Sequence, residues 1–152
     1  MDAETRDRPH LGYFEGGEHR FAVRVYFEDT DLSGIVYHAG YLRFMERARS
    51  DMLRVAGIDQ RGRMEAGEGA YAVADLAIKY RSPARLDDDL LVVSKVADVR
   101  AASCIIHQRV MREHDILTDA SVTVALLNAA GRPVRQPREW VETFNRLKSG
   151  EE

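Results

Sequence analysis

Apolar side chains alternate with polar ones in the segment from residue 20 to residue 31. Every second position there is apolar, which predicts a half-buried β-strand, and these positions are Phe21, Val23, Val25 and Phe27. From residue 39 to residue 56 the apolar spacing changes to steps of four and three, at Tyr41, Met45, Ala48, Met52 and Val55. This spacing predicts a long helix with one apolar stripe, and Gly57 is a suitable C-terminal stop.

Four further segments are rich in strong β formers and are joined by short polar turns, over residues 71–81, 89–99, 103–112 and 117–128. Short connections make consecutive strands antiparallel. A short helix over residues 138–148 closes the chain. We therefore expect an α+β fold in which a five-stranded antiparallel β-sheet curls around one long α-helix. Residues 1–19 are expected to form a flexible N-terminal arm, residues 20–130 the folded domain, and residues 131–152 a C-terminal segment.

The composition is that of a single globular domain. Of the 152 residues, 45% are hydrophobic and 31% are charged, which excludes a disordered chain. A net charge of −3 disfavours nucleic-acid binding. No apolar run is long enough to span a bilayer, and the N-terminus lacks the pattern of a secretory signal. The single Cys104 cannot form an internal disulfide, and we expect a cytoplasmic protein without a transmembrane segment.

Candidate chemistry is concentrated between the first strand and the long helix. Glu28, Asp29 and Asp31 lie at the expected strand end, and His38 lies just before the helix. The first N–H groups of a helix have no partner within it and carry partial positive charge, so a carbonyl resting there would be polarised. A nearby carboxylate could then attack that carbonyl or activate water.

Three simpler interpretations compete with this one. The acids could form a solvated turn, and His38 could cap or pack against the helix. The same residues could also bind a divalent metal. However, alternation along a strand would place Asp29 and Asp31 on one side and Glu28 on the other, and no second histidine follows at a ligand spacing. We therefore expect no metal.

The stretch DTDLSGIVYHAGYLRFMERAR, residues 29–49, closely resembles the hotdog-fold acyl-CoA thioesterases. Within these, it most resembles the Tol-Pal-associated YbgC type, which is related to 4-hydroxybenzoyl-CoA thioesterase. The resemblance extends over roughly residues 23–126 and includes YRSPARLDD at residues 80–88. It implies a hotdog fold and the hydrolysis of an acyl-CoA to a free acid and coenzyme A. No cofactor is implied, because coenzyme A is part of the substrate.

The resemblance also assigns roles to residues. Asp31 corresponds to the catalytic carboxylate, and the backbone N–H of His38 to the group that binds the thioester oxygen. The resemblance also marks the His38 side chain as important, and it could orient the substrate or hydrogen-bond Asp31. Gly34 and Tyr37, which lie between Asp31 and His38 in the sequence, are expected to contact substrate. Relatives often carry a tyrosine four residues before the aspartate, where this chain has Phe27. The role of that hydroxyl is therefore absent here or passes to the neighbouring Tyr26.

Other candidate substrate contacts are charged. Glu46 lies beside the apolar stripe of the helix, where it could bind substrate, pair with a neighbouring arginine or contact a second subunit. Coenzyme A carries phosphates, for which arginine is well suited. Arg81, Arg85 and Arg100 are the favoured phosphate ligands, and a C-terminal cluster at residues 132–138 is the alternative.

Alternative functions remain open at this point. The substrate could be an acyl-carrier-protein thioester, or the chain could be a non-catalytic acyl-binding adaptor linked to the cell-envelope Tol-Pal system. Hydration of an enoyl thioester is a third possibility, although the D-T-D motif favours hydrolysis. The resemblance further implies a homo-oligomer, a tetramer built as a dimer of dimers, with each active site at the dimer interface.

Overall fold

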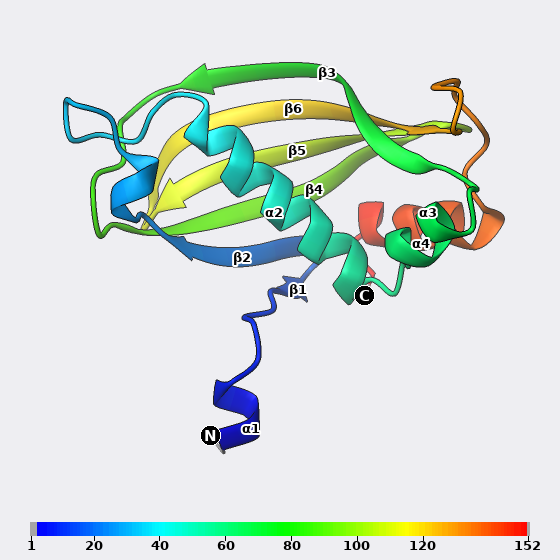
Figure 1. The fold of residues 1–152 in the computed structure, drawn as a ribbon, viewed down its shortest axis with the longest axis horizontal. Helices are drawn as coiled ribbons and strands as arrows, with labels where there is room; N and C mark the ends of the chain where they lie inside the picture. Colours follow the sequence, from blue (N-terminus) through cyan, green and yellow to red (C-terminus); the bar gives the residue numbers. More distant parts are fainter. Residues whose placement is uncertain (1–2, 152) are drawn as a thin grey trace.

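The long helix lies across one face of a curved antiparallel sheet (Figure 1). The computed structural model describes residues 3–151. Six strands form one sheet in the order β1-β2-β4-β5-β6-β3. The strands are β1 Tyr13–Glu15, β2 Glu18–Arg24, β3 Ala70–Tyr80, β4 Asp89–Val99, β5 Ser103–Arg112 and β6 Asp115–Leu127. The helices are α1 Ala3–Arg6, the 3-10 turn η1 Phe27–Asp29, α2 Gly40–Val55, α3 Gln60–Glu65 and α4 Arg138–Lys148.

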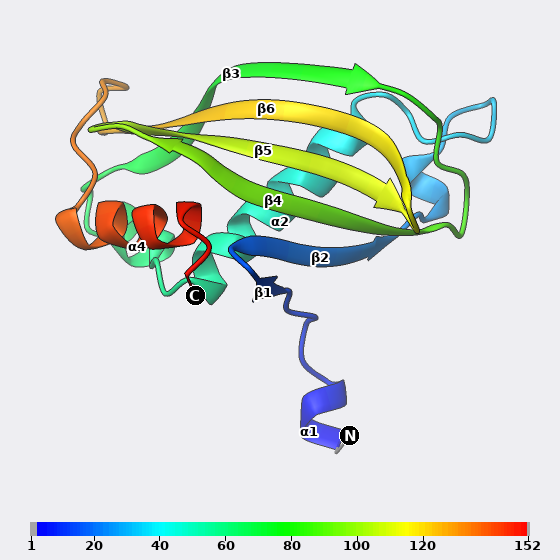
Figure 2. The ribbon, with the colours of Figure 1, turned by 180° about the vertical axis from the view of Figure 1, so that it is seen from behind.

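The predicted apolar stripe of α2 forms the centre of the core. Tyr41, Met45, Ala48 and Met52 are all buried, and Phe44 joins them at 1% exposure. Val55, the last residue of the predicted stripe, is instead 38% exposed because the helix ends there. The reverse view in Figure 2 shows the sheet in front of α2, with α4 beside one end of the sheet. Phe144 and Leu147 of α4 pack against the second half of α2 and close the core at that end.

The sheet has one strand more than the five expected. The additional strand, β1, lies within the segment that the sequence assigned to a flexible N-terminal arm. It pairs with β2, which itself begins before residue 20 and contains the fully buried His19. Residues 13–19 therefore belong to the sheet and not to an arm.

The expected strand over residues 20–31 is also too long. The strand ends at Arg24, and residues Phe27–Asp29 form the turn η1. Two hydrogen bonds stabilise this turn. The Asp29 carboxylate accepts the N–H of Tyr26 at 2.8 Å, and the Thr30 hydroxyl donates to the carbonyl of Phe27 at 2.8 Å. Phe27 is consequently 80% exposed rather than half-buried. Strand alternation thus does not decide which side the acids at residues 28–31 face.

Strand β3 is a long free edge of the sheet. Within the described residues it pairs only with β6, and the register shifts between Val73 and Asp75. Val73 and Leu76 on this strand are 51% and 36% exposed. A long edge with exposed apolar side chains favours pairing with another chain. Within residues 3–151 no helix is both long and apolar enough to cross a membrane.

A buried hydrogen bond joins the β1–β2 hairpin to α2. His19 Nε2–H donates to Asp51 Oδ2 at 2.7 Å, and the N–H of Gly12 donates to the same oxygen at 2.8 Å. A Cβ atom at Gly12 would come within 2.5 Å of the carbonyl oxygen of Arg20, so this close approach requires glycine. Burial lowers the pKa of His19 from its ordinary 6.5, and the Asp51 carboxylate only partly opposes this shift.

We expect this histidine to make the protein less stable in acid. Because the pKa of His19 is lower in the folded chain, the unfolded chain takes up the proton first as the pH falls below about 6.5. Each unit of difference corresponds to about 1.4 kcal/mol of unfolding free energy. Denaturant titrations near neutral pH and near pH 5 should show a larger loss for the wild type than for His19→Gln. The exposed His107 supplies the control, since His107→Gln should keep the wild-type pH dependence. Equal acid sensitivity of His19→Gln and the wild type would contradict this role for His19.

Candidate active site

Asp31 lies on a tight loop between η1 and the start of α2. The N–H of Asp31 donates to the carbonyl of Ile35 at 2.9 Å, and the N–H of Gly34 donates back to the carbonyl of Asp31 at 3.0 Å. Gly34 has a φ of 81°, which a side chain would disfavour. This backbone geometry is by itself enough to explain why residue 34 is a glycine, so no substrate contact is needed for that explanation.

The Asp31 carboxylate is held ionised by its own loop. Its Oδ1 atom accepts the hydroxyl of Ser33 and also the backbone N–H of Ser33, at 2.8 Å. The Ser33 hydroxyl is the first cause, and the Ser33 N–H the second, that lowers the pKa of Asp31. An exposed, ionised carboxylate can act as a base or as a nucleophile at neutral pH, but not as an acid.

His38 lies immediately before the N-terminus of α2. Its carbonyl accepts the Tyr80 hydroxyl at 2.7 Å, and its ring lies 4.4 Å from the ring of Tyr37, centroid to centroid. The N–H of Tyr37 donates to Asp29, and that of Gly40 donates to Tyr37. The two residues between Tyr37 and Gly40 are His38 and residue 39, and their N–H groups have no backbone acceptor in the described part of the chain. They are therefore free to bind an oxygen at the positive end of the helix.

The β3–β4 connection supports both the Asp31 loop and α2. The carbonyl of Ala84 accepts the N–H of Val36 at 2.9 Å, and the N–H of Ala84 donates to the Tyr41 hydroxyl at 2.9 Å. Ala84 and Tyr41 are buried, at 0% and 3% exposure. The loop that carries the candidate carboxylate is thus anchored to the first turn of the helix that carries the candidate N–H donors.

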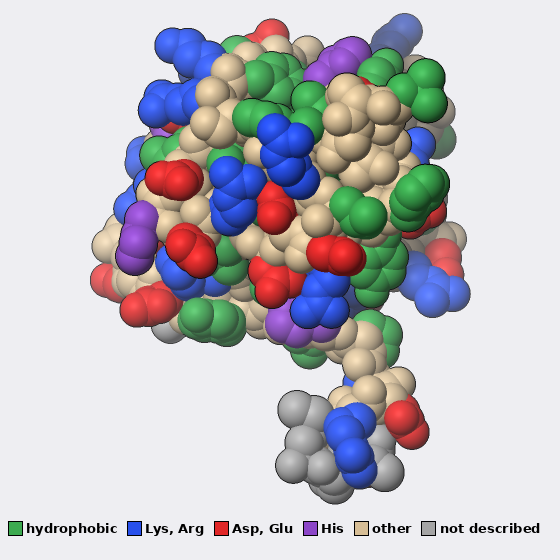
Figure 3. All heavy atoms as spheres, turned by 90° about the vertical axis from the view of Figure 1, so that its left-hand side faces the viewer, with side chains coloured by type: hydrophobic (Ala, Val, Ile, Leu, Met, Phe, Trp, Pro, Cys, Tyr) green, Lys and Arg blue, Asp and Glu red, His purple; other side chains and the backbone are tan. Residues whose placement is uncertain are grey.

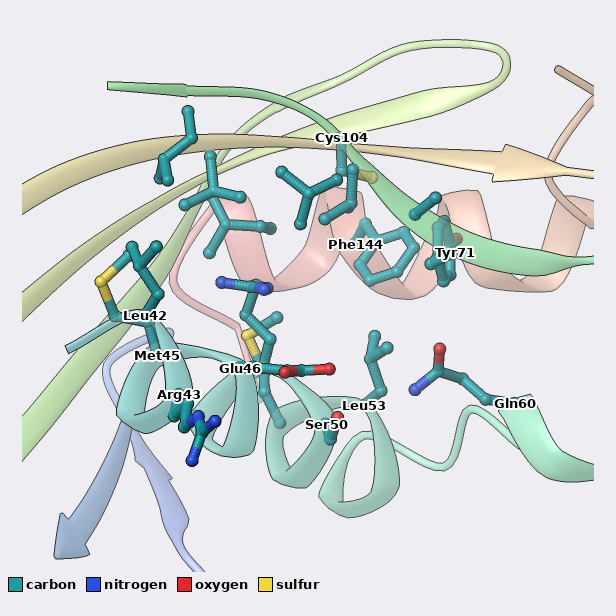
Figure 4. A pocket seen from close by; sticks show the side chains of 18 residues that line it. Leu42, Arg43, Met45, Glu46, Ser50, Leu53, Gln60, Tyr71, Cys104 and Phe144 are labelled. Atoms are coloured by element: carbon teal, nitrogen blue, oxygen red, sulfur yellow. The ribbon is translucent and has the colours of Figure 1, made fainter. Parts of the chain in front are cut away.

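A cleft of about 440 Å³ runs along α2 beside the edge strand β3. In Figure 4, Leu42, Met45, Glu46 and Leu53 of α2 lie across the cleft from Tyr71, Cys104 and Phe144. The remaining lining residues are Arg43, Arg49, Ser50, Met52, Gln60, Ala72, Val73, Leu76, Ile106, Val122 and Val124. The cleft is mostly apolar, with few polar groups, as is typical of small-molecule sites. Among these residues the sequence interpretation selects only Glu46, because the cleft is assembled from six elements that are distant along the chain.

Comparison with known proteins decides which family this architecture represents. Residues 25–144 match the family model of the thioesterase-like superfamily. The chain belongs to this superfamily. It is 43% identical over 129 residues to the acyl-CoA thioesterase YbgC of Haemophilus influenzae, which covers 84% of this chain and 95% of that protein. The acyl-CoA thioester hydrolase YbgC of Escherichia coli O157:H7 is 39% identical over 127 residues, or 82% of this chain and 94% of that protein.

Solved structures agree with this assignment. A probable thioesterase from Bartonella henselae superposes with a TM-score of 0.75 at 35% identity, over 79% of this chain and 99% of that structure. The resemblance identified in residues 29–49 is therefore confirmed, and so is the α+β hotdog architecture.

The far end of the cleft in this thioesterase-like chain is closed by a hydrogen-bonded group. Gln136 Oε1 accepts both the Tyr71 hydroxyl and, at 3.4 Å, the Cys104 thiol. Burial raises the pKa of Cys104 to about 11. The thiol consequently stays protonated and is a poor nucleophile.

The three favoured arginines do not lie together. Arg85 forms a backbone bridge with Ile35 of the Asp31 loop, and Arg81 lies in the same connection, with Asp119 at 3.5 Å. Arg100 instead follows β4 at its other end, where its side chain pairs with Asp98 at 3.1 Å. Only two of the three therefore share an end of the sheet with Asp31, because β4 separates the two connections by its full length.

The end of the molecule that carries the Asp31 loop has a mixed surface. Figure 3 shows basic, acidic and hydrophobic side chains interspersed on it. Exposed apolar residues from the loops around Asp31 contribute to this surface, namely Tyr26, Phe27, Leu32, Tyr37 and Leu86. In the part of the chain that the structure describes, no cluster of three or more His, Cys, Asp or Glu side chains could hold a metal ion.

We expect the Ser33 hydroxyl to control the ionisation of Asp31. Ser33→Ala removes the hydrogen bond that contributes most to the lowered pKa, so the pKa of Asp31 should rise. NMR titration of the labelled Asp31 carboxyl group measures this directly. The exposed Ser82, whose N–H donates to Leu117, supplies the control, because Ser82→Ala should leave the Asp31 midpoint unchanged. An unchanged Asp31 midpoint in Ser33→Ala would refute the assignment.

Proposed function

We propose that this protein hydrolyses the thioester of an acyl-CoA to a free acid and coenzyme A, with Asp31 as the catalytic carboxylate. The observation that carries the proposal is an ionised carboxylate on the loop that leads into a helix with free N–H groups, and the same helix lines an apolar cleft from Leu42 onward. The names of the relatives at 39–43% identity support the same reaction.

The arrangement suits the chemistry of a thioester. The carbonyl oxygen rests on the N–H of His38, where the positive end of α2 stabilises the negative charge that develops on it. Asp31 either takes a proton from water as the water attacks, or attacks the carbonyl itself to form an anhydride that water then cleaves. A thiol with a pKa of about 8.5 leaves as thiolate without strong help from an acid.

We assign the coenzyme A phosphates to the side of the molecule that carries Arg81 and Arg85. Arg85 is the better candidate, since no carboxylate within residues 3–151 forms an ion pair with its guanidinium, whereas Arg81 has Asp119 nearby. Arg100 is not included because it lies at the other end of β4. Tyr37, exposed beside His38, lies where the coenzyme would approach. The carrier-protein substrate, the Tol-Pal connection and the cytoplasmic location stay predictions.

The central test compares two neighbouring aspartates. Asp31→Asn keeps the size of the side chain and an oxygen that can accept the Ser33 bonds, but it removes charge and basicity. Loss of a catalytic base typically costs about 10²–10⁴-fold in rate. Asp29→Asn is the matched control, because an amide oxygen can still accept the N–H of Tyr26, and kcat should change by less than about tenfold. Thiol release from a panel of acyl-CoAs gives kcat, and circular dichroism shows that both variants fold. Near wild-type turnover by Asp31→Asn would refute the proposed mechanism.

We further propose that a second copy of the chain packs along β3, with dimers pairing into a tetramer. The free edge of β3, its exposed Val73 and Leu76, and the cleft that opens beside it support this arrangement. A partner there would cover the cleft and the edge together.

Light scattering tests the assembly directly. The wild type should be at least dimeric at micromolar concentration, and Leu76→Arg should shift it toward monomer, since the charge would be buried without a partner. Leu11→Arg is the control, because Leu11 is similarly exposed but lies outside β3. A fully active wild-type monomer would contradict the proposal.

A further inference from the structure

Arg49 is the charged side chain of α2 that lies deepest in the cleft wall. It is partly buried, while Glu46 and Arg43, which also line the cleft, are exposed. The same cleft is lined by the apolar Met45, Met52 and Ile106, together with the exposed Glu46, whose charge acts on Arg49. A guanidinium in such a place requires an explanation, because a charge removed from water is costly unless it is paired.

The position of the Arg49 guanidinium is fixed by a side chain of the sheet strand β5. Arg49 Nη1 donates to Gln108 Oε1 at 2.8 Å. Gln108 is fully buried, and its amide nitrogen donates to the carbonyl of Met45 at 3.0 Å and to the Ser94 hydroxyl at 2.9 Å. These two bonds fix the amide so that its oxygen faces Arg49. The guanidinium is therefore preorganised at one place in the cleft wall.

The charge of Arg49 is not neutralised by the described residues. Among residues 3–151, none of the ion pairs includes Arg49. Its hydrogen-bond partner, Gln108, is neutral, and a guanidinium has five N–H donors. Burial lowers the pKa of Arg49, and the nearby Glu46 only opposes this shift. Donors and charge are thus left over for a ligand in the cleft.

We propose that Arg49 binds a carboxylate at the far end of the acyl group, so that the preferred substrates are monothioesters of dicarboxylic acids. This inference rests on the proposed thioesterase function. A carboxylate matches the planar fork of a guanidinium and neutralises it, which an aliphatic chain end does not. Arg49 would then be a specificity-determining residue within an otherwise apolar site.

The helix geometry indicates the length of the acyl group. Arg49 follows His38 by eleven positions, about 16 Å along the helix axis. Helical side chains lean toward the N-terminus, which brings the guanidinium back by about one turn. A gap of about 10 Å remains between the carbonyl site and the guanidinium. A straight chain of medium length, such as the octanedioyl group, spans a gap of this size.

The test is a ratio of two matched substrates. We expect the wild type to have a higher kcat/KM for octanedioyl-CoA than for octanoyl-CoA, in which a methyl group replaces the terminal carboxylate. Arg49→Met should lower this ratio by about 10–100-fold, the size expected for one hydrogen-bonded charge pair. Arg49→Lys keeps the charge without the fork and should retain part of the preference. Because a ratio is measured within each variant, a general loss of activity cancels.

Two further variants sharpen the result. Glu46→Gln removes the negative charge beside the site and should raise the ratio, opposite in sign to Arg49→Met. Arg54→Met, on the exposed side of α2 outside the cleft, should leave the ratio as it is in the wild type. Inhibition by the free acids gives a second readout, in which octanedioate should inhibit the wild type more strongly than octanoate does, and Arg49→Met should lose that difference.

The outcomes separate this inference from the proposed function. If the wild type hydrolyses octanoyl-CoA but shows no preference for octanedioyl-CoA, the role of Arg49 is refuted and the thioesterase proposal stands. If neither substrate, nor any other acyl-CoA, is hydrolysed, the proposed function itself fails. A change of oligomeric state in Arg49→Met with an unchanged ratio would show that Arg49 pairs with a second copy of the chain, which also overturns the inference.

Discussion

The burial of one face of α2 against the curved sheet is the contact on which the other features depend. Tyr41, Phe44, Met45 and Ala48 are all less than 4% exposed. Because the helix is held along its length, its N-terminus and the free N–H groups there lie fixed after the Asp31 loop. The same packing leaves the flank of α2 beside β3 uncovered, and this flank forms the cleft. Scaffold and site are therefore consequences of one apolar stripe.

Polar links cross the apolar layer at both ends and in the middle of α2. The Tyr41 hydroxyl accepts the N–H of Ala84 near the N-terminus, Arg49 bonds to Gln108 in the middle, and Asp51 bonds to His19 near the C-terminus. Buried polar groups are costly unless satisfied, so a helix shifted along the sheet would lose all three links. These bonds set the position of the helix more sharply than apolar packing alone could.

Burial and local hydrogen bonds act differently on the ionisable groups of this protein. Asp31 is exposed, and bonds from Ser33 within its own loop lower its pKa. His19 and Cys104 are buried. Burial lowers the pKa of His19 and raises that of Cys104, which favours the neutral form of each. The Asp31 carboxylate can therefore remain charged at the surface without support from the core, whereas the buried groups contribute to stability and shape. This division is consistent with a site whose charge chemistry lies on loops and whose binding surface lies on packed elements.

The sequence by itself determined the elements whose side chains repeat with a regular period. The bounds of α2, β4, β5 and α4 follow from that spacing to within one residue, and the residues at 29–49 were enough to identify the family. Tertiary structure alone decided that residues 13–19 join the sheet, whereas the turn at η1 comes from local hydrogen bonds and the separation of Arg100 from Arg85 from the length of β4. Tertiary structure also created the cleft and the Arg49–Gln108 contact, whose partners are 59 positions apart. The reason is physical: periodicity records which face of an element is buried, but not which distant residue covers it.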